Sequence, residues 1–467
     1  MALSEPRPTV RPGFRRVAIA ACLVLAPVAI WTAWDYLEAR RLASAVAQVR
    51  LRGEPVAPPD KSAPDVGAPD NAARYYTAAA ALVITDGLYG PTGVLTRLDT
   101  RPTPPESVLG DVRAFLETNS EAEALLAKAT EMEFRGYLAG FDYNYRADRL
   151  WMLTAIANLR AFERAMVRDG DGAATAVVRQ LRVARPLGWS ASSAFIDVTS
   201  GLGTYGVVSA ASELAMILPL EPSPAALAQV QANLEALDTD GAIAEVLMSD
   251  QARLLGAYWD DAHQWYARLP REFAPFTGPW FLLLRPWTAH QVVAHAWLLG
   301  DQLAEARRPW PERLHVTAPA EAEAPATRGR QLPWSMIPFA PGLDLTRAMH
   351  RARTERIAST LAIVRVAIVA TAVARYRLAH AATLPATLDE LTPELLPSLP
   401  IDPYSGKSLR YAKQDSGFVV YSIGRNETDD DGKELNQQLS KRWGPYSRAR
   451  ETADIGLRVE FNRAAPR

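Results

Sequence analysis

The sequence predicts a mainly α-helical protein with an N-terminal transmembrane helix, an α-helical body and a small C-terminal α+β module. Three observations predict this class. An uncharged apolar run begins at Val17 and ends at Trp34, and Ala-rich segments with apolar residues at helical spacing fill the middle of the chain. Two short segments rich in β-branched and aromatic residues follow near the end. The expected segments are an anchor and juxtamembrane helix (1–52), a linker (53–70), the body (71–304), a Pro-rich linker (305–342) and the module with its tail (343–467).

The composition excludes few functions but limits the partners. With 467 residues, the chain is long enough for two or three domains. Lys and Arg (51) nearly balance Asp and Glu (52), so the charge gives no indication of a nucleic-acid partner. The single cysteine, Cys22, lies inside the apolar run. No disulfide can form within the chain, and the fold therefore depends on packing.

The apolar run at 17–34 is long enough to cross a bilayer, with Trp31 and Trp34 as interface anchors. A cleaved signal peptide would need a small-residue site directly after the run, but Asp35 and further charges precede the first such site. A lipoprotein would use Cys22, yet the apolar run continues past it. An uncleaved anchor that contacts the lipid bilayer fits best. Four arginines precede the run and four follow it by residue 52, so the positive-inside rule leaves its orientation open.

The body is predicted as a series of helices. The expected ranges are 72–83, 107–128, a hairpin of 150–167 and 173–184, then 192–218, 225–237 and 242–257. Gly201, Gly203 and Gly206 in the fourth segment follow no strand and have no GxGxxG order. They indicate close helix packing more than a ligand loop.

Residues 258–310 are rich in aromatic side chains, including Trp259, Trp265, Trp280 and Trp287. Two interpretations stay open: an aromatic core under Pro-rich loops, or a surface that stacks on glycan rings or rests on a bilayer interface. The second would suit an envelope hydrolase or glycan-binding protein.

Motifs for catalysis are scarce. No GxSxG, P-loop or HExxH motif occurs, and the six histidines have no metal-binding spacing. Glu163, Asp197 and Glu213 lie on apolar helical stretches and are the candidates for paired carboxylates of a hydrolase. The sequence favours a protein that is not an enzyme.

The C-terminal module begins with a long helix at 343–380, whose apolar middle is interrupted by arginines such as Arg365. We expect a packed core helix there and not a second span. A capping box at Thr387 and Glu390 starts a short helix, and a turn follows at 402–407. Strands are predicted at 408–412 and 418–423, joined by a loop of about five residues.

The order of these elements resembles the globular part of the major pseudopilin of bacterial type II secretion. It is still more similar to the C-terminal module of uncharacterised bacterial envelope proteins, which share the pattern LP…LDEL…DP…GKxLRY…YSxG…DDG found here between residues 384 and 432. The resemblance implies a single-pass protein of the bacterial inner membrane, with its body in the periplasm and other envelope proteins as partners. No catalytic activity is implied. In pseudopilins the anchor runs directly into the long helix, whereas more than 300 residues separate the two here.

The loop at 426–432 is the best candidate for a ligand site. Asp429, Asp430 and Asp431 offer hard oxygen donors at a turn, as calcium requires. As an EF-hand the loop is incomplete, because position 12 is Gln438 and not Glu. Pseudopilins bind calcium in the corresponding loop, and the resemblance implies Asp454 as a further ligand. We therefore predict a Ca2+ site, with a solvated Asp-rich turn as the alternative.

Overall fold

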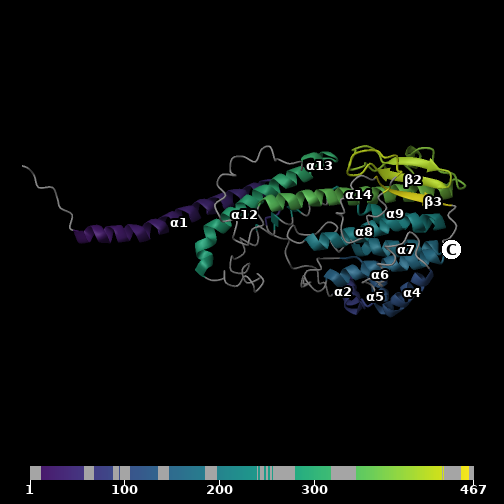
Figure 1. Cartoon of the computed structure of the whole chain (residues 1–467), viewed down its shortest axis with the longest axis horizontal. Coiled ribbons are helices and arrows are strands. Elements are labelled where there is room, and N and C mark those ends of the chain that lie inside the picture. The colour runs from purple at the N-terminus through teal and green to yellow at the C-terminus, as the bar shows by residue number, and fades with distance from the viewer. Residues whose placement is uncertain are drawn as a thin grey trace, which may run out of the picture. The chain divides into compact units, whose positions relative to one another are not determined.

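The computed structural model is mostly helical, with a small antiparallel sheet near the C-terminus (Figure 1). It forms two compact units. The first contains α1 (Pro12–Leu51) and α12 (Pro279–Ala306) up to Gln302, and the second contains the remaining described elements. Residues 71–247 of the predicted body thus belong to one unit with the C-terminal module, whereas residues 248–302 of the predicted body belong to the first unit. The structure describes residues 12–56, 68–87, 94, 106–134, 147–184, 197–238, 240–241, 244, 247–248, 251–252, 255, 279–316, 343–433, 435 and 454–461.

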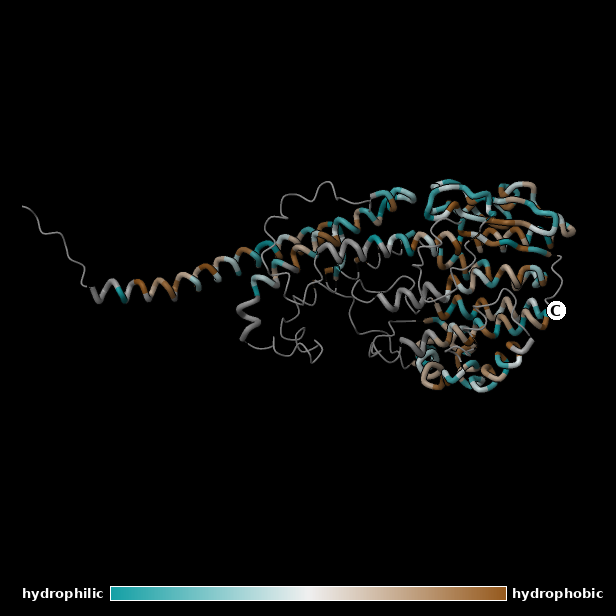
Figure 2. Tube along the Cα trace, in the orientation of Figure 1, coloured by the Kyte–Doolittle hydropathy of each residue, from teal (hydrophilic) through white to brown (hydrophobic). Residues whose placement is uncertain are grey.

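Helix α1 has two halves with different surroundings. Its first half carries exposed apolar side chains such as Leu23 and Ile30. Figure 2 shows brown, hydrophobic segments along this half of the helix. The stretch Ala21–Leu51 is long and apolar enough to cross a membrane, which agrees with the predicted N-terminal span. In its second half, side chains three and four positions apart turn to one face and are buried. The resulting cluster joins α1 to α12 and contains Leu42, Val46, Val49, Leu255, Val292, Val293 and Ala296.

The second unit begins with packed helices. They bury a core of Val, Leu, Ile, Phe and Ala side chains, which includes Leu116, Leu126, Leu153, Ile156 and Leu159. The helices are α2 (Ala72–Leu82), α4 (Glu106–Thr118), α5 (Ser120–Thr130), α6 (Ala147–Met166), α7 (Gly170–Ala184), α8 (Asp197–Ile217) and α9 (Pro224–Glu235), with the 3-10 turn η1 (Leu218–Leu220) between the last two.

The single helix predicted at 107–128 is wrong, because the structure has two helices separated at Asn119. The Asn119 side chain is buried and bonded to the backbone of Ile84, accepting from its N–H at 2.8 Å and donating to its carbonyl at 3.1 Å. It also donates to the Phe115 carbonyl at 3.0 Å. A buried amide that satisfies backbone groups of another segment offers the chain an alternative to a continuous helix.

Helix starts follow the local sequence. Asp169 accepts a hydrogen bond from the Gly172 N–H at 2.8 Å at the start of α7, in the predicted turn of the helical hairpin. Ser223 caps α9 through the Ala226 N–H, and Pro224 occupies the first helical position. Gly206 on α8 agrees with the packing interpretation, because a Cβ there would lie 3.2 Å from Thr154 Cγ2 on α6, whereas the surroundings of Gly201 and Gly203 lie outside what the structure describes.

Helix α14 (Leu343–Ala379) confirms the prediction of a core helix. Its segment Thr354–Ala379 has the length and hydropathy of a membrane span, but nearly all of it is buried within the protein. The capping box then forms at Thr387 and Glu390 as predicted and starts the 3-10 helix η5 (Leu388–Leu391).

The sheet has the strand order β1 (Arg410–Gln414), β2 (Gly417–Ser422), β3 (Ile455–Glu460), with both pairs antiparallel. Gln414 pairs with Gly417, so the hairpin loop has two residues, and the predicted five-residue loop is wrong. A Cβ on Gly417 would lie 1.8 Å from the Val459 carbonyl oxygen, so only glycine allows this close approach of β3. We did not predict β3, although its alternating Ile455, Leu457 and Val459 were a usable signal.

The sheet and α14 pack directly on the helical body. Helix α8 contacts β3, and Gln231 on α9 donates to the Leu395 carbonyl at 2.7 Å. Arg375 on α14 donates to the Gln231 side-chain oxygen at 2.7 Å. These bonds explain why body and module form one unit, with α9 between the two parts in Figure 1.

Candidate functional site

The acidic loop follows β2 and is closed by a residue from just before β3. Glu427 and Asp431 adopt positive φ angles of 54° and 59°, and Gly432 follows at 63°. These turns direct the Gly432 N–H to the Asp454 carboxylate at 2.9 Å, and the Asp430 N–H lies 3.5 Å from the other oxygen of that carboxylate. The structure therefore brings Asp454 to the acidic loop. Burial raises the pKa of the Asp454 carboxyl, against the two backbone donors.

The three consecutive aspartates have separate partners within the protein. Asp429 accepts hydrogen bonds from Arg410 and Tyr421, each at 3.0 Å, and from the Asp431 N–H at 3.1 Å. Burial opposes ionisation of Asp429, but these donors outweigh it and lower the pKa of its carboxyl. Asp431 pairs with Lys433 at 2.9 Å, and Asp430 accepts from Asn426 at 3.2 Å.

This arrangement is a hydrogen-bonded turn. Calcium takes six to eight oxygen ligands. Among the described residues, no group of three or more His, Cys, Asp or Glu side chains is placed to hold one metal ion. An ion bound to Asp429 or Asp431 would compete with Arg410 and Lys433 for these carboxylates. Calcium binding by Asp429, Asp430, Asp431 and Asp454 stays a prediction.

The DP turn of the pattern is built around a buried carboxylate. Asp402 is 1% exposed and accepts hydrogen bonds from the Ser422 hydroxyl at 2.6 Å and the Ser405 hydroxyl at 2.9 Å. The backbone N–H groups of Tyr404 and Ile423 donate to it at 3.0 and 3.3 Å. Asp402 thus joins the turn to the end of β2, which gives this motif a structural role.

A second buried carboxylate, Glu213, lies between α6 and α8. It accepts hydrogen bonds from Asn158 and, at 3.1 Å, from the Ser209 hydroxyl, and its Oε2 atom is buried. Glu213 is half-buried as a residue, but its Oε2 atom does not reach the surface. Burial raises the pKa of Glu213 to about 8 despite these donors.

The candidate hydrolase carboxylates have different environments. Glu163 forms ion pairs with Arg113, Arg160 and Arg164 at 3.2 to 3.5 Å, whereas Glu213 accepts from uncharged donors. The side chain of Asp197 lies outside the described residues. Nothing described joins Glu163 and Glu213 in one site, and the hydrolase interpretation stays a prediction.

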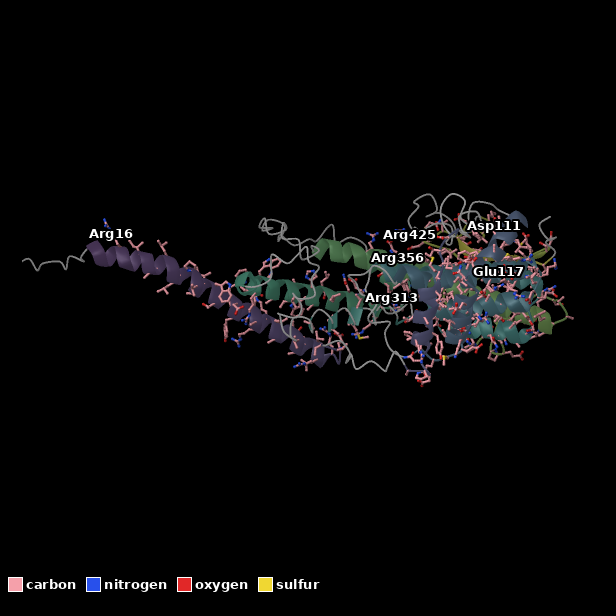
Figure 3. All side chains as sticks on the ribbon, turned by 90° about the horizontal axis from the view of Figure 1, so that it is seen from below. Arg16, Asp111, Glu117, Arg313, Arg356 and Arg425 are labelled. Carbon is pink, nitrogen blue, oxygen red and sulfur yellow. The ribbon has the colours of Figure 1, made fainter. Side chains whose placement is uncertain are left out.

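The aromatic region is described only from residue 279. Trp259 and Trp265 lie outside the described residues. Trp297 is half-exposed on α12, in the first unit. In the second unit Trp310 is buried and donates to Asp240 at 3.0 Å, and Arg313, labelled in Figure 3, lies over its ring. Trp310 therefore supports the core interpretation, and glycan binding by the remaining tryptophans stays a prediction.

Sequence reasoning missed the role of Arg365. Its guanidinium is buried on α14 and bonds to Asp238 at 2.9 Å, Asp240 at 2.8 Å and the Ile401 carbonyl at 2.7 Å. Arg365 therefore connects the chain after α9 with the DP turn. The signal was available, because an arginine in an otherwise apolar buried helix requires acidic or carbonyl partners.

Comparisons with known proteins add no identity. The chain matches no protein-family model, no curated protein and no solved structure. The resemblance to pseudopilin modules therefore rests on the sequence pattern and stays a prediction.

Proposed function

We propose that this chain is a single-span membrane protein of the bacterial envelope, whose second unit is a non-enzymatic scaffold for other envelope proteins. One observation carries the proposal. In α1, a single helix, large apolar side chains such as Leu23, Val28 and Ile30 are exposed in the first half, while Leu42 and Val46 are buried in the second. A helix with these two halves suits two environments, lipid for the first and protein for the second.

The orientation is proposed from the C-terminal module. Its similarity to pseudopilin modules favours a body in the periplasm and an anchor in the inner membrane. Arg16, exposed at the beginning of α1 and labelled in Figure 3, would then lie with its neighbouring arginines on the cytoplasmic side.

A scaffold is favoured because the buried charges described above hold elements together. Arg365 connects α14 to Asp238, and Asp402 connects its turn to Ser422. The Arg365 side chain donates three hydrogen bonds and the Asp402 carboxylate accepts four inside the protein. Such groups rigidify a fold, and a rigid unit held by an anchor can present constant surfaces to partners.

Anchoring is tested by membrane fractionation after alkaline carbonate extraction. Leu25→Asp combined with Val28→Asp places two charges in the middle of the apolar run, which should cost about 2.5 to 3.5 kcal/mol each in lipid and move the chain to the soluble fraction. Leu51→Asp is the matched control, because Leu51 is also exposed but lies at the other end of α1. A double variant that stays in the membrane would contradict the proposed span.

The periplasmic location is tested separately with C-terminal reporter fusions. Alkaline phosphatase is active only outside the cytoplasm, and green fluorescent protein exported by the general secretory route is dark. We expect an active phosphatase fusion and a dark fluorescent fusion. The opposite result would reverse the orientation. The scaffold role predicts that defined envelope proteins copurify with the intact chain and are lost with Arg365→Met.

A further inference from the structure

We propose that the first turns of α12, residues 279–284, lie in the interface layer of the bilayer that α1 crosses, as a second lipid contact of the first unit. The inference rests on the proposed anchoring by α1. The occupant of this segment is a lipid surface, and the argument comes from the register between α1 and α12, the bend of α12 and its sequence.

The two helices run in the same direction. Asp35 on α1 pairs with Arg285 on α12 at 3.2 Å, and Glu38 pairs with His290 at 3.2 Å. Further along, the buried cluster of Leu42, Val46 and Val49 includes Val292, Val293 and Ala296 of α12. The Arg52 guanidinium then lies beside Gly300. Increasing residue numbers on one helix therefore meet increasing numbers on the other, which defines a parallel pair.

This register places the start of α12 at the end of the apolar run. Asp35 is the first charged residue after Trp34, and the pair that it forms with Arg285 belongs on the water side of the bilayer surface. Residues 279–284 directly precede Arg285, so they begin at the level of Trp31 and Trp34 of α1, within about 9 Å along a helix. That level is the headgroup layer, which is about 5 to 8 Å thick on each side.

The bend in α12 keeps this segment in the layer. Pro286 lies inside the helix and removes a backbone donor, which is a common cause of a kink. Figure 1 shows that α12 bends and that its first turns leave α1 sideways. A segment that runs across the axis of a membrane-spanning helix extends along the bilayer surface and does not pass through it.

The sequence of the segment suits lipid. Residues 280–284 read Trp-Phe-Leu-Leu-Leu. Because successive helical residues are 100° apart, five consecutive apolar residues give a helical segment without a polar face, a composition typical of a protein core or of a membrane contact. Trp and Phe in particular favour the headgroup region. Arg285 at the end of the segment marks its return to water.

The test uses depth-dependent quenching in the full chain. Cys22→Ser removes the natural thiol, and Leu282→Cys is labelled with an environment-sensitive fluorophore. The protein is reconstituted in phosphatidylcholine and phosphatidylglycerol vesicles that carry a nitroxide either at the headgroup or deep in the acyl chain. We expect a blue-shifted emission and stronger quenching by the headgroup nitroxide than by the deep one.

Two control positions separate the possible failures. Val28→Cys on α1 should be quenched by the deep nitroxide, and Trp297→Cys, further along α12, by neither. Quenching at residue 28 with none at residue 282 would overturn this inference and leave the anchor intact. No quenching at residue 28 would overturn the anchoring itself and, with it, this inference. Disulfide-linked dimers of unlabelled Leu282→Cys without lipid quenching would assign the segment to a second copy and also overturn the proposal.

Discussion

Arg365 on α14 donates a hydrogen bond to Asp238 at 2.9 Å, although 127 residues separate the two in the sequence. Burial raises the pKa of the Asp238 carboxyl, and Arg365 opposes that rise. Loss of Arg365 would leave Asp238 without its charged partner, whereas loss of Asp238 would leave Arg365 still bonded to Asp240.

We predict that Arg365→Met destabilises the protein by about 3 kcal/mol, because it leaves Asp238 unpaired in the interior. Urea unfolding followed by circular dichroism measures this change. Arg351→Met is the control, since Arg351 is half-exposed and pairs with Glu355 within the same helix. It should cost at most about 1 kcal/mol. Equal losses in both variants would contradict the importance of the buried pair. When Asp238→Asn is added to Arg365→Met, it should restore part of the lost stability, because it removes the unpaired charge of Asp238.

Glu213 predicts a pH dependence of stability. Burial raises the pKa of its carboxyl to about 8, above the value of about 4.3 that we expect in the unfolded chain. The folded protein therefore binds one proton more than the unfolded chain between these values. The contribution of Glu213 is fully present below pH 4 and is lost as pH rises toward 8, by up to about 1.4 kcal/mol per pH unit.

Glu213→Gln removes this proton linkage and keeps an oxygen acceptor for Asn158 and Ser209. Stability curves for both proteins between pH 5 and 8 provide the measurement, and other titrating groups cancel in the difference. We expect the variant to gain stability relative to wild type as pH rises. A difference that is constant with pH would show that Glu213 is ionised in the folded protein.

Gly206 and Gly110 offer a matched pair of glycine substitutions. Gly206→Val would place methyl groups against Thr154 and Ala184, where even a Cβ would lie at 3.2 and 3.3 Å, and should cost about 1 to 3 kcal/mol through overpacking. Gly110 lies inside α4, where a Cβ would meet no other atom within 4 Å, and Gly110→Ala should stabilise by about 0.5 to 1 kcal/mol. Thermal melting reports both. A tolerated valine at position 206 would refute close packing of α8.

Asp402→Ala removes the acceptor shared by Ser422, Tyr404, Ser405 and Ile423. Because buried N–H and hydroxyl donors then lack a partner, we expect a loss of about 2 to 4 kcal/mol. Asp415→Ala, in the exposed two-residue hairpin loop, should change stability by less than about 1 kcal/mol. Chemical unfolding measures the loss of stability in both variants. Similar losses would contradict a structural role of the Asp402 carboxylate.

Calcium binding is tested on the full chain in detergent. The sequence-based prediction is that calcium releases heat in a titration and raises the unfolding midpoint, because bound ligand stabilises the folded state by mass action. Asp431→Asn should weaken both effects, and magnesium serves as the ion control. If calcium releases no heat and leaves the unfolding midpoint unchanged, the loop does not bind calcium. Asp454 then serves only to accept hydrogen bonds from the backbone.

Several local features could be read from the sequence alone because their causes lie within a few residues. The apolar run at 17–34, the capping box at Thr387 and the Ser223 cap depend on nearby backbone donors or on residue type. The break at Asn119 was missed because its partner, Ile84, lies 35 residues away. The hairpin loop was placed too long, because Lys413, Gln414 and Gly417 are polar or small by type and yet take part in the pairing of β1 with β2.

The sequence by itself determined the mainly helical class, the exposed apolar half of α1 and the core character of α14, because hydrophobic periodicity and composition report burial directly. Tertiary structure alone decided which distant groups meet: Arg365 with Asp238 and Asp240, Asp402 with Ser422, and Asp454 with the acidic loop. It also joined residues 71–247 of the body and the C-terminal module into one unit. Such pairings depend on how helices and strands pack in three dimensions, and a residue's neighbours in the chain carry little information about them.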